Sequence, residues 1–230
     1  MTNYLSAEQN AVSQKFSNKK LKTLMASTAI AAAGLVLLSA GPAKALPSGE
    51  QVVGGDVSYE RAGNTLNAYQ ATERAYTLWD SFDTSADEAV NIFTPGASSL
   101  SVNKVIGGST TQFEGALTSN GNVWILNQNG VFFGASARID TAGILASTGD
   151  VTVADVMDGD NKFEFSNFGA GKIENFGTMN IAEAGLAAFV APFAANNGVI
   201  NAKLGTVAFA AGEKVTLDMY GDGLLEIAVD

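Results

Sequence analysis

The sequence predicts an all-β protein, and within that class a parallel β-helix. Three observations support this prediction. Short apolar segments alternate with turns rich in Gly, Asn and Asp, several glycines recur at a regular interval, and one strong turn signal runs directly into an apolar strand. The interval is roughly 21 residues, and repeats of this length are typical of units that cannot bury their own apolar face and must stack on their neighbours.

The first 45 residues form a segment with the composition of an export leader. Four lysines lie between residues 15 and 22, the uncharged run Leu24–Ala40 follows, and Ala43-Lys44-Ala45 has the small residues that signal peptidase reads. We therefore expect a signal peptide over residues 1–45, cleaved after Ala45, and one domain over residues 46–230. A retained membrane anchor is the alternative, because the run approaches spanning length. Its many Ala, Ser and Thr residues, and the processing site after it, favour the leader.

Charge and composition exclude several classes of partner and of catalytic site. Removal of residues 1–45 takes away five of the 13 basic and one of the 23 acidic residues, which leaves 8 basic and 22 acidic residues and a net charge of −14. An acidic surface argues against nucleic acid or an anionic membrane as partner. The chain has no Cys and no His, which excludes disulfides, His-dependent catalytic triads and most zinc sites. We expect no enzymatic activity, no cofactor, no metal and a monomer.

Strands are predicted along the domain wherever β-branched and aromatic residues lie between turn residues. The predicted strands are Val52–Tyr59, Thr65–Ala71, Ala75–Trp79, Ala89–Phe93, Ser99–Val105, Asn122–Leu126, Val131–Phe133, Ala137–Asp140 and Val215–Met219. One short helical turn is predicted around Asp150–Met157, where valines are flanked by acids.

The strongest local signal is the octet Asn127–Gly134, with the sequence NQNGVFFG. Gly130 and Gly134 lie where the backbone must turn, and Asn127 and Asn129 have side chains that bond locally. Val131-Phe132-Phe133 supplies the bulky side chains that suit a strand. The octet therefore predicts a corner that leads into a strand.

The repeat is visible in the glycines. The successive intervals between Gly121, Gly143, Gly185 and Gly205 are 22, 42 and 20, and we interpret the longest one as two turns of the repeat. Apolar residues keep the same spacing, because Leu117, Ile139 and Ile181 each lie four residues before such a glycine. Residues 175–179 map by one repeat onto residues 196–200, and Leu186 maps onto Val207.

These spacings favour a β-helix over a leucine-rich repeat, because the regular Leu ladder of the latter is missing. Roughly nine turns at about 4.8 Å each would make a rod on the order of 40 Å long. The period breaks before Gly121 and between Gly149 and Phe168. We expect caps or excursions at these places, since an uncovered end exposes strand edges.

A series of motifs in a fixed order resembles a known family. The motifs are Leu46–Gly49, Gly63–Leu66, Trp79-x-Ser81-Phe82, Asn103–Gly108, Asn127–Gly134, Ala142–Thr148 and Val207–Asp218. Together they resemble the amino-terminal two-partner-secretion domain of filamentous haemagglutinin-like exoproteins and adhesins, also called the haemagglutination activity domain. The resemblance implies a right-handed single-stranded parallel β-helix with an amino-terminal β cap and short extra-helical excursions.

The resemblance also implies a function in export. The domain would be a non-enzymatic secretion signal, recognised in the periplasm of a Gram-negative cell by a dedicated outer-membrane transporter. It would direct a large exoprotein to the cell surface and nucleate β-helix folding outside. The site residues implied are the turn residues Asn127, Gln128, Asn129, Gly130 and Gly134, and a second motif with Asn103, Lys104, Gly107 and Gly108. An adhesin module that binds host or matrix glycans is the alternative, and a polysaccharide-degrading β-helix enzyme is a remote one.

The octet departs from the family pattern at one position, because Gln128 stands where the family has Pro. Gln fits the second position of a type I turn, so we expect the turn to survive with a loss of at most about 1 kcal/mol. A direct contact of that Pro with the transporter would be lost here.

Other polar and aromatic groups have simpler interpretations. The acids in Asp155–Asn161 do not match a calcium motif and predict a solvated loop. The aromatic residues are expected in the core, with Trp124 the exception if it lies on an outer face. Lys104 and Arg138 are expected to pair with acids such as Asp140 or to stay solvated.

Overall fold

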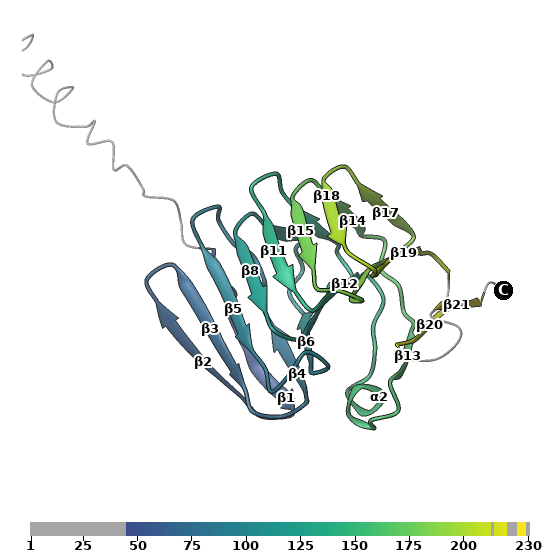
Figure 1. The fold of residues 1–230 in the computed structure, drawn as a ribbon, viewed down its shortest axis with the longest axis horizontal. Coiled ribbons are helices and arrows are strands. Elements are labelled where there is room, and N and C mark those ends of the chain that lie inside the picture. Colours follow the sequence, from purple (N-terminus) through teal and green to yellow (C-terminus); the bar gives the residue numbers. More distant parts are fainter. Residues whose placement is uncertain (1–44, 213, 220–224, 229–230) are drawn as a thin grey trace, which may run out of the picture. The chain divides into compact units, whose positions relative to one another are not determined.

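Three parallel sheets wind around one apolar core, as the repeat predicts. The computed structural model describes residues 45–212, 214–219 and 225–228 (Figure 1). The chain divides by its contacts into Met1–Ala43 and Lys44–Asp230, and all described residues lie in the second unit. The predicted leader lies outside the described residues except for Ala45. No helix of the described residues is long and apolar enough to span a membrane.

Each turn of the solenoid contributes strands to the same sheets. Sheet I consists of β1 (Gln51–Gly54), β4 (Arg74–Trp79), β6 (Leu100–Val105), β9 (Asn122–Leu126), β12 (Gly143–Ser147), β16 (Leu186–Val190) and β19 (Thr206–Ala210). Sheet II consists of β2 (Val57–Ala62), β3 (Thr65–Gln70), β5 (Ala89–Phe93), β8 (Ala116–Ser119), β11 (Arg138–Thr141), β15 (Thr178–Ile181) and β18 (Val199–Ala202). Sheet III consists of β7 (Thr111–Phe113), β10 (Val131–Phe133), β14 (Lys172–Asn175) and β17 (Phe193–Asn196). The fold is a right-handed parallel β-helix of about seven turns.

An antiparallel cap closes the first turn, which confirms the expected amino-terminal β cap. The predicted strand Val52–Tyr59 is wrong as one piece, because a bend at Gly55 divides it into β1 and β2. β1 pairs antiparallel with β4, and β2 pairs antiparallel with β3. Tyr59 of β2 packs edge-on against Trp79 at a centroid distance of 5.1 Å and so covers the end of the core. Burial raises the pKa of its hydroxyl to about 12, and that hydroxyl shares a 2.7 Å hydrogen bond with Thr77.

Apolar side chains that alternate with outward ones fill the solenoid. The large buried members of this inner core are Leu66, Trp79, Phe82, Val90, Ile92, Phe113, Leu117, Val123, Ile125, Val131, Phe133, Ile139, Ile144, Ile173, Met179 and Phe189. They stack in columns, so that Leu117, Ile139, Met179 and Ile200 lie in register on successive strands. The predicted match of residues 175–179 to 196–200 is confirmed in this register.

Three details of the predicted repeat are wrong. Ile181 pairs with Thr141, while Met179 takes the predicted place of Ile181 beside Ile139. Ile144 of β12 pairs directly with Ala187 of β16, so the interval from Gly143 to Gly185 makes one turn and not two. Leu186 pairs with Thr206, one residue short of the predicted Val207. The long turn holds an excursion, which removes one turn from the predicted nine, and β20 and β21 also lie outside the solenoid, which has about seven turns.

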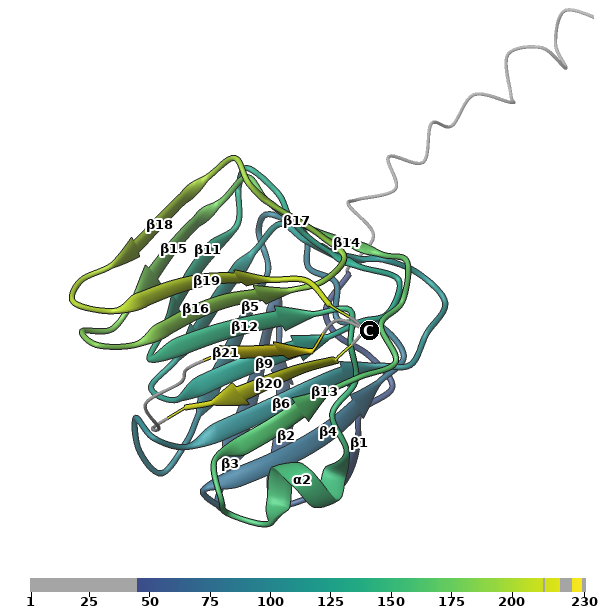
Figure 2. The same cartoon turned by 90° about the vertical axis from the view of Figure 1, so that its right-hand side faces the viewer.

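The excursion forms a second layer over the outer face of sheet I, in front of β4, β6 and β9 in Figure 2. It begins with α2 (Val153–Met157), which Thr152 caps and which matches the predicted helical turn. β13 (Lys162–Phe165) follows and pairs antiparallel with β20 (Lys214–Asp218), which in turn pairs with β21 (Leu225–Ala228). We call α2, β13, β20 and β21 the second layer.

A second apolar core lies between this layer and the solenoid. Its buried members are Tyr76, Leu100, Val102, Trp124, Leu126, Leu145, Val151, Val156, Phe163, Phe165, Ala188, Val190, Ala210, Val215 and Leu217. Strand β9 is therefore buried on both faces. Trp124 does lie on the outer face of its sheet, yet it is only 1% exposed, because Phe163 and Phe165 cover it at 4.6 and 5.4 Å.

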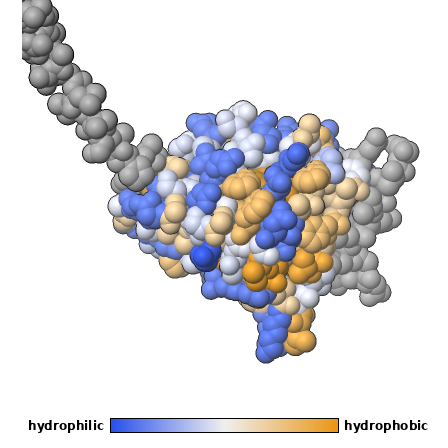
Figure 3. Space-filling view, turned by 90° about the horizontal axis from the view of Figure 1, so that it is seen from above, coloured by the Kyte–Doolittle hydropathy of each residue, from blue (hydrophilic) through white to orange (hydrophobic). Residues whose placement is uncertain are grey.

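Exposed apolar side chains gather on the last turn. Phe193, Val199, Leu204, Val207 and Phe209 are each between 43% and 77% exposed. The face seen from above in Figure 3 carries both hydrophilic and hydrophobic residues, and the hydrophobic ones, in orange, lie mostly on the side of the later turns. Among the described residues, no further solenoid strand covers these side chains of the last turn.

Candidate functional site

The octet forms the predicted corner, and Asn127 holds it together. Asn127 is buried at 1% exposure, and its side-chain amide donates to Ser109 O at 3.0 Å and to Thr111 Oγ1 at 2.9 Å. Its Oδ1 accepts from the backbone N–H of Asn129 at 2.9 Å. The N–H of Gly130 donates to Asn127 O at 2.8 Å, which closes the turn. One side chain therefore ties its own turn to the chain segment of the previous one.

Gln128 and Asn129 point away from the core, and their side chains bond to a later and to an earlier segment of the chain. The amide of Gln128 donates to Asn167 O at 2.8 Å. The amide of Asn129 donates to Gly107 O at 3.1 Å, and Asn129 O accepts from Thr110 Oγ1 at 2.7 Å. The turn thus survives without Pro, and Gln128 adds a hydrogen bond that Pro is unable to make.

The two glycines of the octet serve different needs. Gly130 has a φ of 104°, in the region that favours glycine, and a Cβ there would lie 2.5 Å from Lys172 O. At Gly134 the need is for space, because a Cβ added there would meet the carboxylate of Glu114, which already accepts a hydrogen bond from the hydroxyl of Ser136. Both glycines therefore shape the corner.

The second motif divides into a buried part and an exposed part. Asn103 is 2% exposed and accepts a 3.1 Å hydrogen bond from the indole N–H of Trp79, so it belongs to the core. Lys104 points outward and forms a 2.5 Å ion pair with Asp150, at the entry to the excursion. A Cβ on Gly107 would lie 2.0 Å from Asp80 O, whereas one on Gly108 would meet no atom within 4 Å.

The two motifs meet at one hollow of about 320 Å³ on the surface. Lys104, Ile106, Gly107, Gly108 and the turn 127–129 line it, together with Gly149 and Asp150. Ile106 is 54% exposed, and the side chains of Lys104 and Asp150 are about one quarter exposed. The hollow offers backbone groups, amides, one exposed apolar side chain beside the buried Val105 and Leu126, and one ion pair, which suits a peptide segment. Of the predicted site residues, Asn103, Gly130 and Gly134 do not line it.

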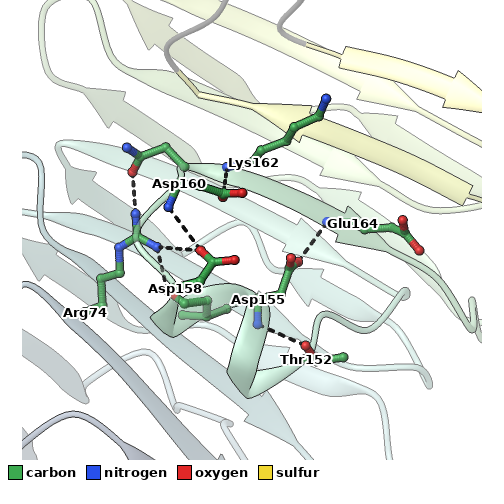
Figure 4. A network of polar contacts seen from close by, with 9 residues as sticks. Arg74, Thr152, Asp155, Asp158, Asp160, Lys162 and Glu164 are labelled. Carbon is green, nitrogen blue, oxygen red and sulfur yellow. Dashed lines mark hydrogen bonds and ion pairs between the residues drawn. The ribbon is translucent and has the colours of Figure 1, made fainter.

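The acidic residues around 155–161 lie on the second layer and bond to their own loop, as Figure 4 shows. Asp155 accepts from the N–H of Glu164, Asp158 from that of Asp160, and Asp160 from that of Lys162. Burial raises the pKa of the Asp155 carboxyl, and the nearby charges of Asp158, Asp160 and Glu164 raise it further. Within the described residues, no three acidic side chains converge as a metal site requires.

Sequence reasoning missed the residues that hold the second layer on the solenoid. Arg74 of β4 donates to Val156 O and to Asn161 Oδ1, both at 2.6 Å, and its guanidinium lies 5.5 Å from the ring of Phe163. Asp150 was not predicted as the partner of Lys104. Arg138 donates to the carbonyls of Ala135 and Ala137 and is exposed, which agrees with the solvated alternative.

Comparison with known proteins places this geometry in a family. A family model described as "TPS secretion domain" matches residues 43–227. Two heme/hemopexin-binding proteins of Haemophilus influenzae are 38% identical over 109 residues and 32% identical over 121 residues. These segments cover 47% and 52% of this chain but only 12% and 13% of the relatives.

A solved structure shares the fold. The HMW1 secretion domain from Haemophilus influenzae superposes with a TM-score of 0.70 at 27% sequence identity. The match covers 80% of this chain and 48% of that one. The family match extends over almost the whole β-helix and its second layer. The chain therefore belongs to the family of two-partner-secretion (TPS) secretion domains.

Proposed function

We propose that this domain is the export signal of a larger secreted protein, recognised in the periplasm by the periplasmic domains of an outer-membrane two-partner-secretion transporter. The observation that carries the proposal is the family match over residues 43–227, which extends over nearly the whole β-helix. The matched segments make up about an eighth of the curated relatives. We assign this shared segment to export rather than to the heme or hemopexin binding for which those relatives are named.

The proposed route includes removal of residues 1–45 after Ala45, passage through the periplasm and release at the cell surface. Sequencing of the amino terminus of the secreted protein tests the cleavage site. A first residue other than Leu46 would contradict that part of the proposal.

Recognition is proposed to involve an extended segment, and folding is proposed to follow outside. From β5 to β19, each described strand of the solenoid except β7 pairs in parallel with a strand of the preceding turn, so each turn provides the edge on which the next one forms. Main-chain pairing of this kind supplies free energy turn by turn, without ATP. The corner at Asn127 contributes because its side chain bonds to the preceding segment at Ser109 and Thr111.

A disulfide lock tests passage in an unfolded form. Asp140 and Asn180 are paired in register on neighbouring strands, both are exposed, and the chain has no Cys of its own. The variant Asp140→Cys/Asn180→Cys, expressed with the transporter, is expected to stall when oxidised and to be secreted when a reductant is present. Each single variant is the control. Normal secretion of the oxidised form would overturn the unfolded route.

A second candidate function is glycan binding at the surface, and one feature of sheet II favours it. Tyr69 and Phe93 lie on neighbouring strands, are 44% and 49% exposed, and stack at a centroid distance of 5.2 Å. Beside them, a row of outward side chains runs through Asn67, Asn91 and Thr118 with mutual hydrogen bonds. Aromatic faces next to amides and hydroxyls suit sugar rings. Loss of binding to immobilised host or matrix glycans in Tyr69→Ala/Phe93→Ala would support this candidate, and unchanged or absent binding would exclude it.

A further inference from the structure

The protein has two apolar cores that share no residue. Inward side chains of the solenoid form the inner core, and outward side chains of sheet I form the second core together with the second layer. The two tryptophans of the chain are divided between them, because Trp79 belongs to the inner core and Trp124 to the second. Each core therefore carries its own spectroscopic probe.

The second layer depends on the solenoid for its docking surface. Within the described strands, β13 pairs only with β20, and β20 pairs only with β13 and β21. The surface beneath is assembled from separate turns, since Tyr76, Val102, Trp124 and Leu145 come from four successive strands of sheet I. Those side chains form one face only when their strands are already paired.

The solenoid does not depend on the second layer in the same way. The strand ladders of sheets I, II and III run from turn to turn without a strand of the second layer. The inner core likewise includes no residue of α2, β13 or β20. Besides the apolar packing of the second core, side chains of β4 and β6 bond to the excursion. These bonds join Arg74 to Val156 O, Asn161 and Asp158, the Tyr76 hydroxyl to Val151 O, and Lys104 to Asp150.

We propose that the second layer is a clasp that docks after the solenoid has formed and opens before the solenoid unfolds. Chain order adds to this asymmetry, because β13 precedes its partner β20 by two complete turns, β14 to β16 and β17 to β19. Until β20 is in place, β13 has no strand partner among the described residues, and the outer face of sheet I is incompletely covered. The proposal does not depend on which transporter the domain meets.

The two tryptophans allow a direct test in the unit from Lys44 to Asp230, which is compact by itself. Trp124→Phe leaves Trp79 to report on the inner core, and Trp79→Phe leaves Trp124 to report on the clasp. In urea titrations we expect the Trp124 signal to change at a lower urea concentration than the Trp79 signal. On refolding, we expect Trp79 to regain its native fluorescence first. Coincident transitions and equal refolding rates would overturn the proposal.

A clasp variant and a matched core variant separate the two steps further. Leu217→Ala, in β20, removes a buried contact opposite Phe163 and should lower the urea midpoint of Trp124 while leaving that of Trp79 unchanged. Ile139→Ala, in the inner core, should lower the midpoint of Trp79. A shift of the Trp79 midpoint by Leu217→Ala equal to that of Trp124 would show one cooperative unit and contradict the clasp.

Hydrogen exchange tests the same idea without any substitution, which matters because Trp79→Phe removes the hydrogen bond to Asn103. Regions that open by themselves exchange faster than the global unfolding rate allows, so amides of β13 and β20 should exchange at least about tenfold faster than those of β9 and β12. Equal protection of the two groups of strands would overturn the proposal.

Discussion

Replacement of Asn127 by Ala is the sharpest test of the corner. The change removes two donated hydrogen bonds, to Ser109 O and Thr111 Oγ1, and one accepted from the N–H of Asn129. Each such bond contributes about 1 kcal/mol net, and a buried group left without its partner costs about 1–3 kcal/mol. Thr111 is 1% exposed, so water does not readily replace the lost donor. We expect Asn127→Ala to lower the free energy of unfolding by about 2–4 kcal/mol.

The assay is urea and thermal unfolding followed by far-ultraviolet circular dichroism. For a domain of this size, about 1 kcal/mol corresponds to roughly 2–4 °C, so the melting temperature should fall by roughly 5–15 °C. Asn201→Ala is the matched control, because Asn201 is exposed and donates one hydrogen bond, to Asn180 at 2.9 Å. That control should change the stability by less than about 1 kcal/mol. If both variants were equally stable, or if Asn127→Ala lay within about 0.5 kcal/mol of the unsubstituted domain, the assigned role of Asn127 would be wrong.

Three further predictions concern the neighbouring groups. Gln128→Pro should stay within about 1 kcal/mol of the unsubstituted domain, because the stiffer turn offsets the lost bond to Asn167 O; a larger change in urea unfolding would count against the turn geometry. Gly107→Ala should destabilise by about 1–3 kcal/mol, because its Cβ would lie 2.0 Å from Asp80 O, whereas Gly108→Ala, which meets no atom within 4 Å, should change the stability by less than about 1 kcal/mol; similar melting temperatures for the two would refute this. The third prediction is a pH dependence. The hydrogen bond from Arg61 lowers the pKa of Glu50, so the stability from Glu50 is present above its ordinary value of 4.5 and is lost as the pH falls through the lowered pKa. Burial raises the pKa of Asp155, so stability falls as the pH rises from its ordinary value of 3.8 through the raised pKa. As the pH falls, the free energy of unfolding should therefore decrease less steeply for Glu50→Gln and more steeply for Asp155→Asn. Changes in the opposite sense would contradict the assignment.

The corner was predictable because its hydrogen bonds join residues that are close together in the sequence. The bonds of the turn lie within four residues, between Asn127, Asn129 and Gly130, and the residue types at these positions specify them. The columns of the inner core were predictable in part, since Leu117 and Ile139 repeat with the turn, whereas Met179 and not the predicted Ile181 continues their column. The family motifs then supplied handedness and the cap, which periodicity alone leaves open.

The glycine spacing could not reveal the second layer. One long turn that contains an excursion gives the same glycine spacing as two plain turns, so Gly143 and Gly185 led to a wrong count. The burial of Trp124 depends on Phe163 and Phe165, and the place of β13 depends on β20, which follows only after six further strands. Arg74 and Asp150 were missed because their partners lie on different elements, and a single sequence carries no signal for such pairs.

The pairing of β13 with β20 also fixes the number of turns that separate them. Solenoids generally tolerate the gain or loss of whole repeats, because each repeat contacts only its neighbours. Here β13 leaves the solenoid two turns before β20 does, and the two strands must still meet in register over Trp124. An added turn would move the start of β20 along the axis by about 4.8 Å, one strand spacing, and break that register. The length of this part of the solenoid is therefore set by a single antiparallel strand pair outside it.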